Sequence, residues 1–295
     1  MPHARSLLAC LGVCLLAAAP PHADAQGADA RTRDVYVSAV DSRGAPVPGL
    51  TAADFVVRED GAAREVLNVR QADAPMHVAL LIDDSQAAAD STLYLREGLA
   101  AFLERLRGRA QVALITMGDR PTVMAPYTAD FEDLQKRVSR IFPRPGAGAY
   151  LLDAVYDASR GLARRQAERR VIVALTFEGA DFSNRQHQQV LQELEASGAS
   201  LHVLAIGTPS PSLSDEMRNR SILIGDGTTR TGGRQDQVLS NMGIPERLKL
   251  AADELVHQYV LTYARPEKLV RPEKLSVTST RPNVTVRAPT RLPAR

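Results

Sequence analysis

The sequence predicts an α/β protein with a doubly wound, mostly parallel sheet and β-rich extensions at both ends. Between residues 76 and 264, short apolar runs typical of buried strands alternate with segments of helical periodicity. The flanking segments instead alternate apolar and polar residues with a period of two, as half-exposed strands do. We therefore expect one large α/β domain and a smaller amount of β structure around it.

The composition is that of an ordinary soluble globular protein. The chain has 295 residues, of which 44% are hydrophobic and 24% are charged. Its formal net charge is +2 at pH 7, an excess too small to indicate nucleic acid as a partner. The length is sufficient for a core that needs no disulfide support.

The first 25 residues have the pattern of a secretory signal peptide. Arg5 precedes an apolar run from Leu7 to Ala19, and Ala23-Asp24-Ala25 forms a small-residue cleavage motif. The run is too short to span a bilayer, so no transmembrane anchor is expected after cleavage. Both cysteines of the chain fall inside it. We therefore predict an exported protein, periplasmic or extracellular, with no cysteine in its mature form.

Residues 26–75 are predicted to form a β-rich N-terminal segment. Residues 34–40 alternate in polarity, and the short strands on either side of Asp60-Gly61 indicate a hairpin. The tail at 265–295 contains two more β-like pieces, KLSVTST and NVTVRAP. We expect this tail to pair with the N-terminal segment, which would bring the two ends of the chain together.

Residues 76–264 are predicted to be the α/β domain. Its expected strands are 76–83, 110–119, 169–177, 200–207 and a final strand at 258–264, with 121–128 as an antiparallel edge strand. Its expected helices are 93–107, 130–141, 150–166, 185–198 and 245–258. Residues 208–243 are rich in Gly, Ser, Thr and Pro, and we expect a long, partly ordered surface excursion there.

The chain is organised around the strand at 76–83, whose apolar run stops at Asp83-Asp84-Ser85. In a parallel sheet the carboxyl ends of the strands meet at one edge, and ligands bind there. These three residues would present oxygen atoms at that edge. Hard cations such as Mg²⁺ prefer oxygen ligands of this kind.

Several strings resemble the von Willebrand factor type A (VWA) fold, a Rossmann-like α/β fold. They resemble most closely the bacterial secreted VWFA-related domain family. The matching segments are Val47–Gly61, Leu80–Ser85, Leu152–Tyr156, Val171–Thr176, Gly225–Arg234 and Glu254–Ala264. Together they cover nearly the whole mature chain. The resemblance implies a protein-interaction module.

Many members of this family hold a metal ion through an Asp-x-Ser-x-Ser loop, a Thr in a second loop and an Asp in a third. Asp83 and Ser85 match the first two positions, but the third Ser falls on Ala87 and the Thr on Ala149. The third-loop Asp falls near Glu178, with Asp181 a little further on. The resemblance thus implies a degenerate adhesion site without a metal cofactor. Its binding loops would be marked by Asp83, Asp84, Ser85, Glu178 and Asp181.

No pattern in the sequence indicates catalysis. The chain has no phosphate-binding GxxxxGK[ST] loop, no HExxH zinc pair and no GxSxG nucleophile elbow. We therefore predict a non-enzymatic module that recognises a protein or cell-envelope partner. Two alternatives stay open: a Mg²⁺-dependent adhesin that retains a partial site with Asp83, Ser85 and Asp181, and a structural component of the cell envelope.

Overall fold

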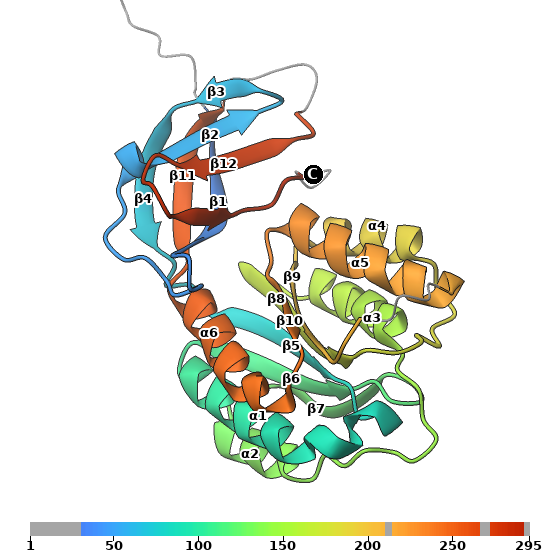
Figure 1. The fold of residues 1–295 in the computed structure, drawn as a ribbon. Helices are drawn as coiled ribbons and strands as arrows, with labels where there is room; N and C mark the ends of the chain where they lie inside the picture. The colour runs from blue at the N-terminus through green and yellow to red at the C-terminus, as the bar shows by residue number, and fades with distance from the viewer. Residues whose placement is uncertain (1–30, 210–213, 266–271, 292–295) are drawn as a thin grey trace, which may run out of the picture.

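The computed structural model describes residues 31–209, 214–265 and 272–291, and it consists of an α/β domain inserted into a β-sandwich. The sandwich is built from both ends of the described chain, and the α/β domain lies between them in the sequence (Figure 1). The predicted signal peptide lies outside the described residues. No helix in the described ranges has the length and apolar character required to cross a membrane.

A six-stranded sheet forms the centre of the α/β domain, with the strand order β10-β9-β8-β5-β6-β7. Every neighbouring pair is parallel except β6 and β7, which are antiparallel as predicted for this edge. The strands are β5 (Met76–Ile82), β6 (Ala110–Thr116), β7 (Thr122–Thr128), β8 (Arg169–Phe177), β9 (Ser200–Ile206) and β10 (Gln235–Val238). This topology confirms the predicted doubly wound, mostly parallel sheet.

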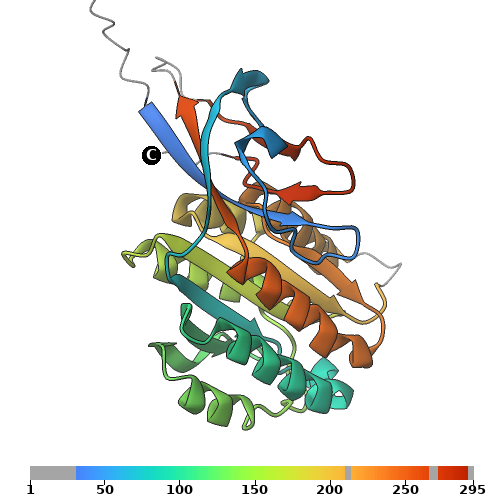
Figure 2. The same cartoon turned by 90° about the vertical axis from the view of Figure 1, so that its left-hand side faces the viewer.

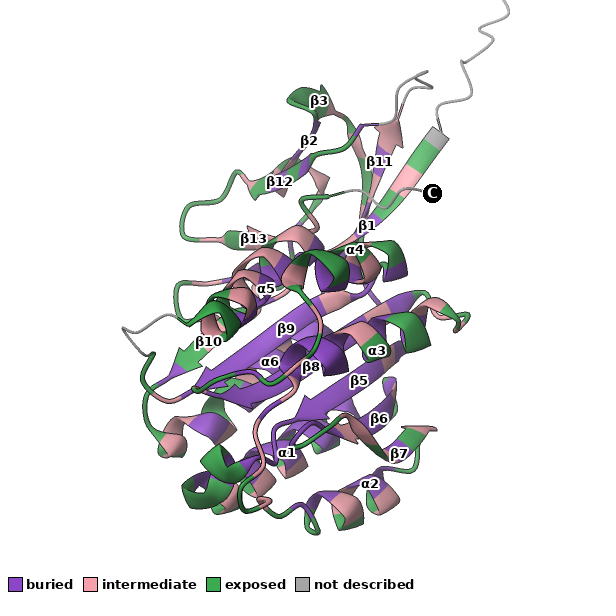
Figure 3. Cartoon of the chain, turned by 90° about the vertical axis from the view of Figure 1, so that its right-hand side faces the viewer, coloured by how far each residue is buried: buried purple, intermediate pink, exposed green. Residues whose placement is uncertain are grey.

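Six helices cover the two faces of this sheet. One face carries α1 (Thr92–Leu106), α2 (Phe131–Val138) and α6 (Ile244–Val256), and the other carries α3 (Leu151–Ala163), α4 (His187–Ser197) and α5 (Asp215–Thr231). Because side chains alternate along a strand, Leu80 of β5 packs with the first group and Leu81 packs with the second. The central strands are consequently buried on both faces (Figure 3).

The β-sandwich consists of two small sheets that enclose a third apolar core. The first sheet contains β13 (Thr285–Arg287), β1 (Arg31–Val40), β11 (Tyr259–Arg265) and β4 (Val66–Gln71), in that order. The second contains β12 (Leu275–Ser279), β2 (Phe55–Glu59) and β3 (Ala62–Arg64). Figure 2 shows the strands from the two ends of the chain side by side. The pairing of the tail with the N-terminal segment is thus confirmed.

The expected final strand at 258–264 is placed in the wrong sheet by the sequence argument. β11 pairs antiparallel with β1 and β4, so it belongs to the sandwich and not to the six-stranded sheet. Its alternate residues Tyr259, Leu261 and Tyr263 are buried in the sandwich core. The α/β domain therefore ends with α6. The apolar run at 258–264 predicts a buried strand, but it does not indicate which of the two sheets that strand joins.

The expectation of a long, partly ordered surface excursion at 208–243 is also wrong. This segment contains α5, β10 and the short 3-10 helix η3 (Asn241–Gly243). Ser214 caps the start of α5 by accepting a hydrogen bond from Met217 N, and Gly232 ends it in the left-handed conformation. A Cβ on Gly227 would lie 2.9 Å from the Leu201 side chain. The glycines that suggested a loop therefore include one that allows close packing of helix on sheet.

The chain passes between the sandwich and the α/β domain twice, at residues 72–75 and 257–258, and these two connections lie side by side. Ala72 N donates to Gln258 O at 2.8 Å. The buried guanidinium of Arg169, at the start of β8, donates to Ala74 O at 3.1 Å, to Leu255 O at 2.7 Å and to Gln258 Oε1 at 2.8 Å. One side chain of the α/β domain thus holds both connections.

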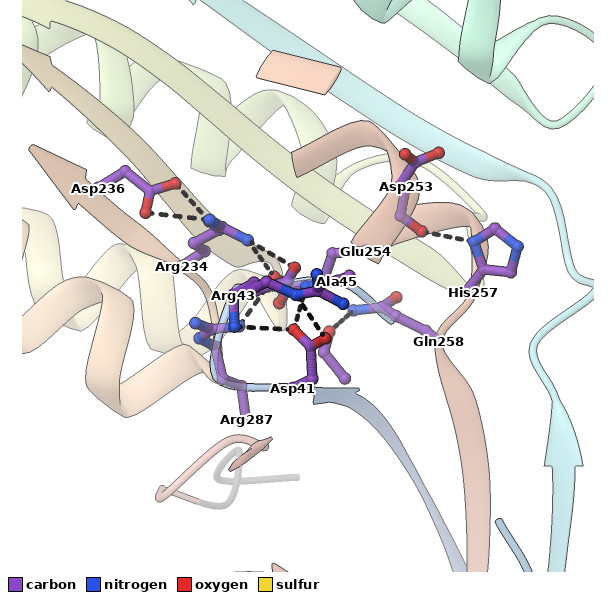
Figure 4. A network of polar contacts seen from close by, with 12 residues as sticks. Asp41, Arg43, Ala45, Arg234, Asp236, Asp253, Glu254, His257, Gln258 and Arg287 are labelled. Atoms are coloured by element: carbon purple, nitrogen blue, oxygen red, sulfur yellow. Dashed lines mark hydrogen bonds and ion pairs between the residues drawn. The ribbon is translucent and has the colours of Figure 1, made fainter. Parts of the chain in front are cut away.

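A second group of charged residues joins the two parts next to α6 (Figure 4). Glu254 of α6 is buried, and its Oε2 accepts hydrogen bonds from Arg234 at 3.0 Å and from Arg287 of β13 at 2.8 Å. Arg234 also pairs with Asp236 of β10 and donates to Gly44 O, in the turn after β1, at 3.3 Å. These contacts fix the orientation of the six-stranded sheet relative to the sandwich.

Candidate functional site at the carboxyl edge of the sheet

Asp83 follows the last residue of β5 and is fully buried. Its Oδ1 accepts a hydrogen bond from Ser85 N at 3.0 Å, and its Oδ2 accepts one from Phe177 N at 2.9 Å and one from Thr176 Oγ1 at 3.4 Å. Ser85 is also buried and begins the 3-10 helix η2 (Gln86–Ser91). Asp83 Oδ1 therefore shapes the loop after β5, and Asp83 Oδ2 holds that loop against the end of β8.

Asp84 points toward the end of β6, on the other side of β5. Its Oδ1 accepts a hydrogen bond from Gly118 N at 2.6 Å, and its Oδ2 pairs with Arg144 Nε at 2.9 Å. Arg144 N also donates to Asp84 O at 2.8 Å. A Cβ on Gly118 would lie 2.7 Å from Asp84 Oδ1, so only glycine allows this approach. Asp84 thus joins the first loop to the segment before α3.

Asp181 joins the segment before α3 to the loop after β8. Its Oδ2 accepts a hydrogen bond from Leu151 N at 2.7 Å, at the start of α3, and its Oδ1 accepts one from Ser183 N at 3.0 Å. Ala149 forms a β-bridge with Asp181. Burial raises the pKa of the Asp181 carboxyl above its ordinary value, and the hydrogen bonds from Ser183 and Leu151 oppose this shift. The carboxylate acts as an acceptor for backbone groups.

Glu178 follows β8 and is paired with an arginine. Its Oε2 pairs with Arg220 Nη1 at 3.2 Å, and its Oε1 accepts a hydrogen bond from Gln237 at 3.3 Å. Arg220 is buried and also donates to Phe177 O at 3.1 Å. Glu178 therefore joins the end of β8 to α5 and β10.

These donors do not fit a divalent cation. Mg²⁺ requires near-octahedral oxygen ligands at roughly 2.0–2.1 Å. Each oxygen of Asp83 and Asp181 already accepts a protein hydrogen bond, and Ala87 and Ala149 provide no side-chain oxygen. In the part of the chain that the structure describes, no three His, Cys, Asp or Glu residues are grouped to hold a metal ion.

The arginines that partner these carboxylates were missed by the sequence argument. Arg144 and Arg220 lie 60 and 42 positions from Asp84 and Glu178, respectively. An arginine at such a distance has no spacing signal, because it reaches its acid only through the folding of the chain. The position of Arg144 in the segment before α3, beside the expected site, was the one indication available.

Large apolar side chains gather at the same edge. Leu93 lies in the first turn of α1, Phe142 precedes α3, Phe182 follows β8, and Leu239 and Met242 follow β10. All five are more than half exposed. Five exposed apolar residues in the segments of one edge give that edge the character of a contact surface.

Residues 78–180 match the family model of the von Willebrand factor type A domain. The structure of a von Willebrand factor type A protein from Catenulispora acidiphila is similar, with a TM-score of 0.52 and 12% identity over 90% of this chain and 74% of that one. The α/β domain is a von Willebrand factor type A domain. Such domains are in general protein-interaction modules, and the predicted fold class is thereby confirmed.

Proximal thread matrix protein 1 of the mussel byssus is a further similar structure. It has a TM-score of 0.50 and 14% identity over 63% of this chain and 50% of the mussel chain. A second structure of that protein, described with a zinc-occupied MIDAS motif, has a TM-score of 0.50 and 15% identity over 68% of this chain and 50% of that one. The chain thus spans half the length of the mussel protein. No curated protein matches it.

We expect Asp83→Ala to destabilise the VWA domain with or without a metal ion. The substitution leaves Ser85 N and Phe177 N without their acceptor, and a buried unsatisfied group costs on the order of 1–3 kcal/mol. Urea denaturation in EDTA should therefore show a loss of about 2 kcal/mol. Asp90→Ala, at an exposed position on η2, is the control. A loss that appears only when Mg²⁺ is added would contradict this structural role.

Proposed function

We propose that this chain is an exported, non-enzymatic protein-interaction module of the bacterial periplasm or exterior. Its VWA domain binds a protein partner at the carboxyl edge of the sheet without a bound metal ion. The observation that supports this proposal is the set of exposed apolar residues at the same edge as loops whose carboxylates are already hydrogen-bonded within the protein.

The three loops are held together without a cation. Asp83 joins the first loop to the third, Asp84 joins the first to the second, and Asp181 joins the second to the third. Gln86 N also donates to Ala147 O at 3.0 Å, and Phe182 N donates to Ala149 O at 2.8 Å. Because protein groups supply every link, the surface is preorganised for a partner, which lowers the entropic cost of binding.

The experiment is affinity capture from the envelope fraction of the source organism with quantitative mass spectrometry. We expect proteins retained in EDTA to be lost, at least about tenfold, when Leu93, Phe182 and Met242 are together replaced by Ser. The control is Leu67→Ser, which removes a nearly half-exposed leucine from β4 of the sandwich.

Two outcomes would contradict the proposal. Retention that requires Mg²⁺ would support the alternative of a metal-dependent adhesin. Retention that survives the triple substitution but is lost in Leu67→Ser would move the contact to the sandwich and support a structural role in the envelope.

A further inference from the structure

The segment between α2 and α3 forms a basic loop at the edge of the contact surface. We define the basic loop as residues 139–146, with the sequence SRIFPRPG, which contains two arginines and no acidic residue. Arg140 and Phe142 are exposed, and the Arg144 side chain is 39% exposed. Positive charge and an aromatic ring are therefore presented together on one short loop.

A third arginine approaches this loop from α1. The Arg96 guanidinium donates to Ile141 O through Nε at 3.2 Å and through Nη2 at 2.6 Å. It also lies over the Phe142 ring, 4.3 Å from the ring centroid. This cation–π contact holds both side chains in place while the ring stays exposed.

The charges of these arginines are only partly neutralised. Arg144 pairs with the buried Asp84, whereas Arg96 and Arg140 form no ion pair with any described residue. A guanidinium can bind a carboxylate through two parallel hydrogen bonds, which makes arginine suited to acidic ligands. The loop is also rigid, because it contains Pro143 and Pro145 and because Gly146 N donates to Gln86 Oε1 at 2.9 Å.

We propose that Arg96 and the basic loop bind an acidic segment of a protein partner that also carries an apolar side chain. Carboxylates of that segment pair with Arg96, Arg140 and the exposed side of Arg144, and its apolar side chain packs on Phe142. This inference rests on the proposed function and names the chemistry of the partner. Arginine thus provides the positive charge at this edge, where the carboxylates do not fit a metal ion.

The test is selection of peptides from a displayed random library on the purified chain in EDTA. We expect the selected peptides to combine Asp or Glu with a neighbouring aromatic or aliphatic residue. The affinity of a synthetic selected peptide should fall about tenfold or more in Arg96→Ala and in Phe142→Ser. It should also weaken with added NaCl, because salt screens exposed charges.

Two further variants keep the test independent of folding. Arg140→Ala changes an exposed side chain that makes no described side-chain contact, so it should weaken the peptide without altering the thermal unfolding curve. Arg58→Ala, on the exposed face of β2 in the sandwich, is the matched control and should leave the affinity unchanged.

Selected peptides without acidic residues would overturn the inference, as would acidic peptides that bind Arg96→Ala and Arg140→Ala with full affinity. If either result occurs while the Leu93, Phe182 and Met242 substitutions still abolish capture of the partner, the inference fails and the proposed function stands. If those substitutions have no effect on capture either, both fail together.

Discussion

Glu254→Ala is expected to destabilise the protein by about 3 kcal/mol, because removing one partner of a buried ion pair leaves an uncompensated charge. Arg234, of which 3% of the side chain is exposed, would lose its buried carboxylate partner, as would Arg287. Losses for such a change are typically about 3 to 5 kcal/mol. We expect the lower end, because Asp236 continues to pair with Arg234.

The measurement is urea denaturation of the purified chain. Lys249→Ala, an exposed substitution on the same helix, is the control and should change the free energy of unfolding by less than about 0.5 kcal/mol. The double variant Glu254→Ala, Arg287→Ala should lose less than the sum of the two single losses, because the two side chains are in contact. A loss below about 1 kcal/mol for Glu254→Ala would show that the network is not a stabilising link.

The second large effect concerns pH. His202 of β9 is buried; its Nε2 lies 3.1 Å from Ser200 Oγ, and its Nδ1 has no hydrogen-bond partner. Burial lowers the pKa of the His202 imidazole to about 4. Among the charged groups that act on it, Glu254 and Asp236 raise this pKa, whereas Arg287 and Arg234 lower it.

The sign of the pH effect follows from the two states of the chain. In the unfolded chain a histidine has a pKa of about 6.5, so between about pH 6.5 and pH 4 the unfolded state binds a proton that the folded state does not. The stability due to neutral His202 is complete above pH 6.5 and is lost on acidification. The expected total loss is about 3 kcal/mol at pH 4.

Urea denaturation at a series of pH values should show this slope in the wild-type chain and a flatter one in His202→Leu. The difference between the two curves isolates His202 from Asp181, whose raised pKa acts in the opposite direction. His257→Gln is the control and should keep the wild-type slope. Parallel curves for the wild type and His202→Leu would contradict the assignment.

Most of the six-stranded sheet could be predicted, because its strands are continuous apolar runs buried on both faces. β11 could not be assigned to its sheet, since Tyr259 and Leu261 are as apolar as a central strand. α5 could not be recognised, since Gly227 serves close packing and not a turn. Local sequence determines what a segment can form, but the partner against which it packs determines where it lies.

Some residues of the candidate site could likewise be predicted from the sequence, and others could not. Asp83 and Ser85 could be found because they directly follow a strand, and their place at the carboxyl edge is a consequence of parallel topology. Arg144 and Arg220 could not, because the fold alone brings them to Asp84 and Glu178. The sequence therefore predicted the interaction loops but not the arginines that pair with their carboxylates.

The insertion of the VWA domain into the sandwich also affects the order in which the parts of the chain can fold during synthesis. Thr262 of β11 bonds to Asp34 of β1, 228 positions earlier in the chain. When β1 leaves the ribosome, the strand that completes its sheet has not yet been made, whereas α1 to α6 and their sheet can close among themselves. The first sheet of the sandwich is therefore completed last, and β1 and β4 lack their neighbouring strands during translation, a state in which exposed strand edges are prone to aggregate.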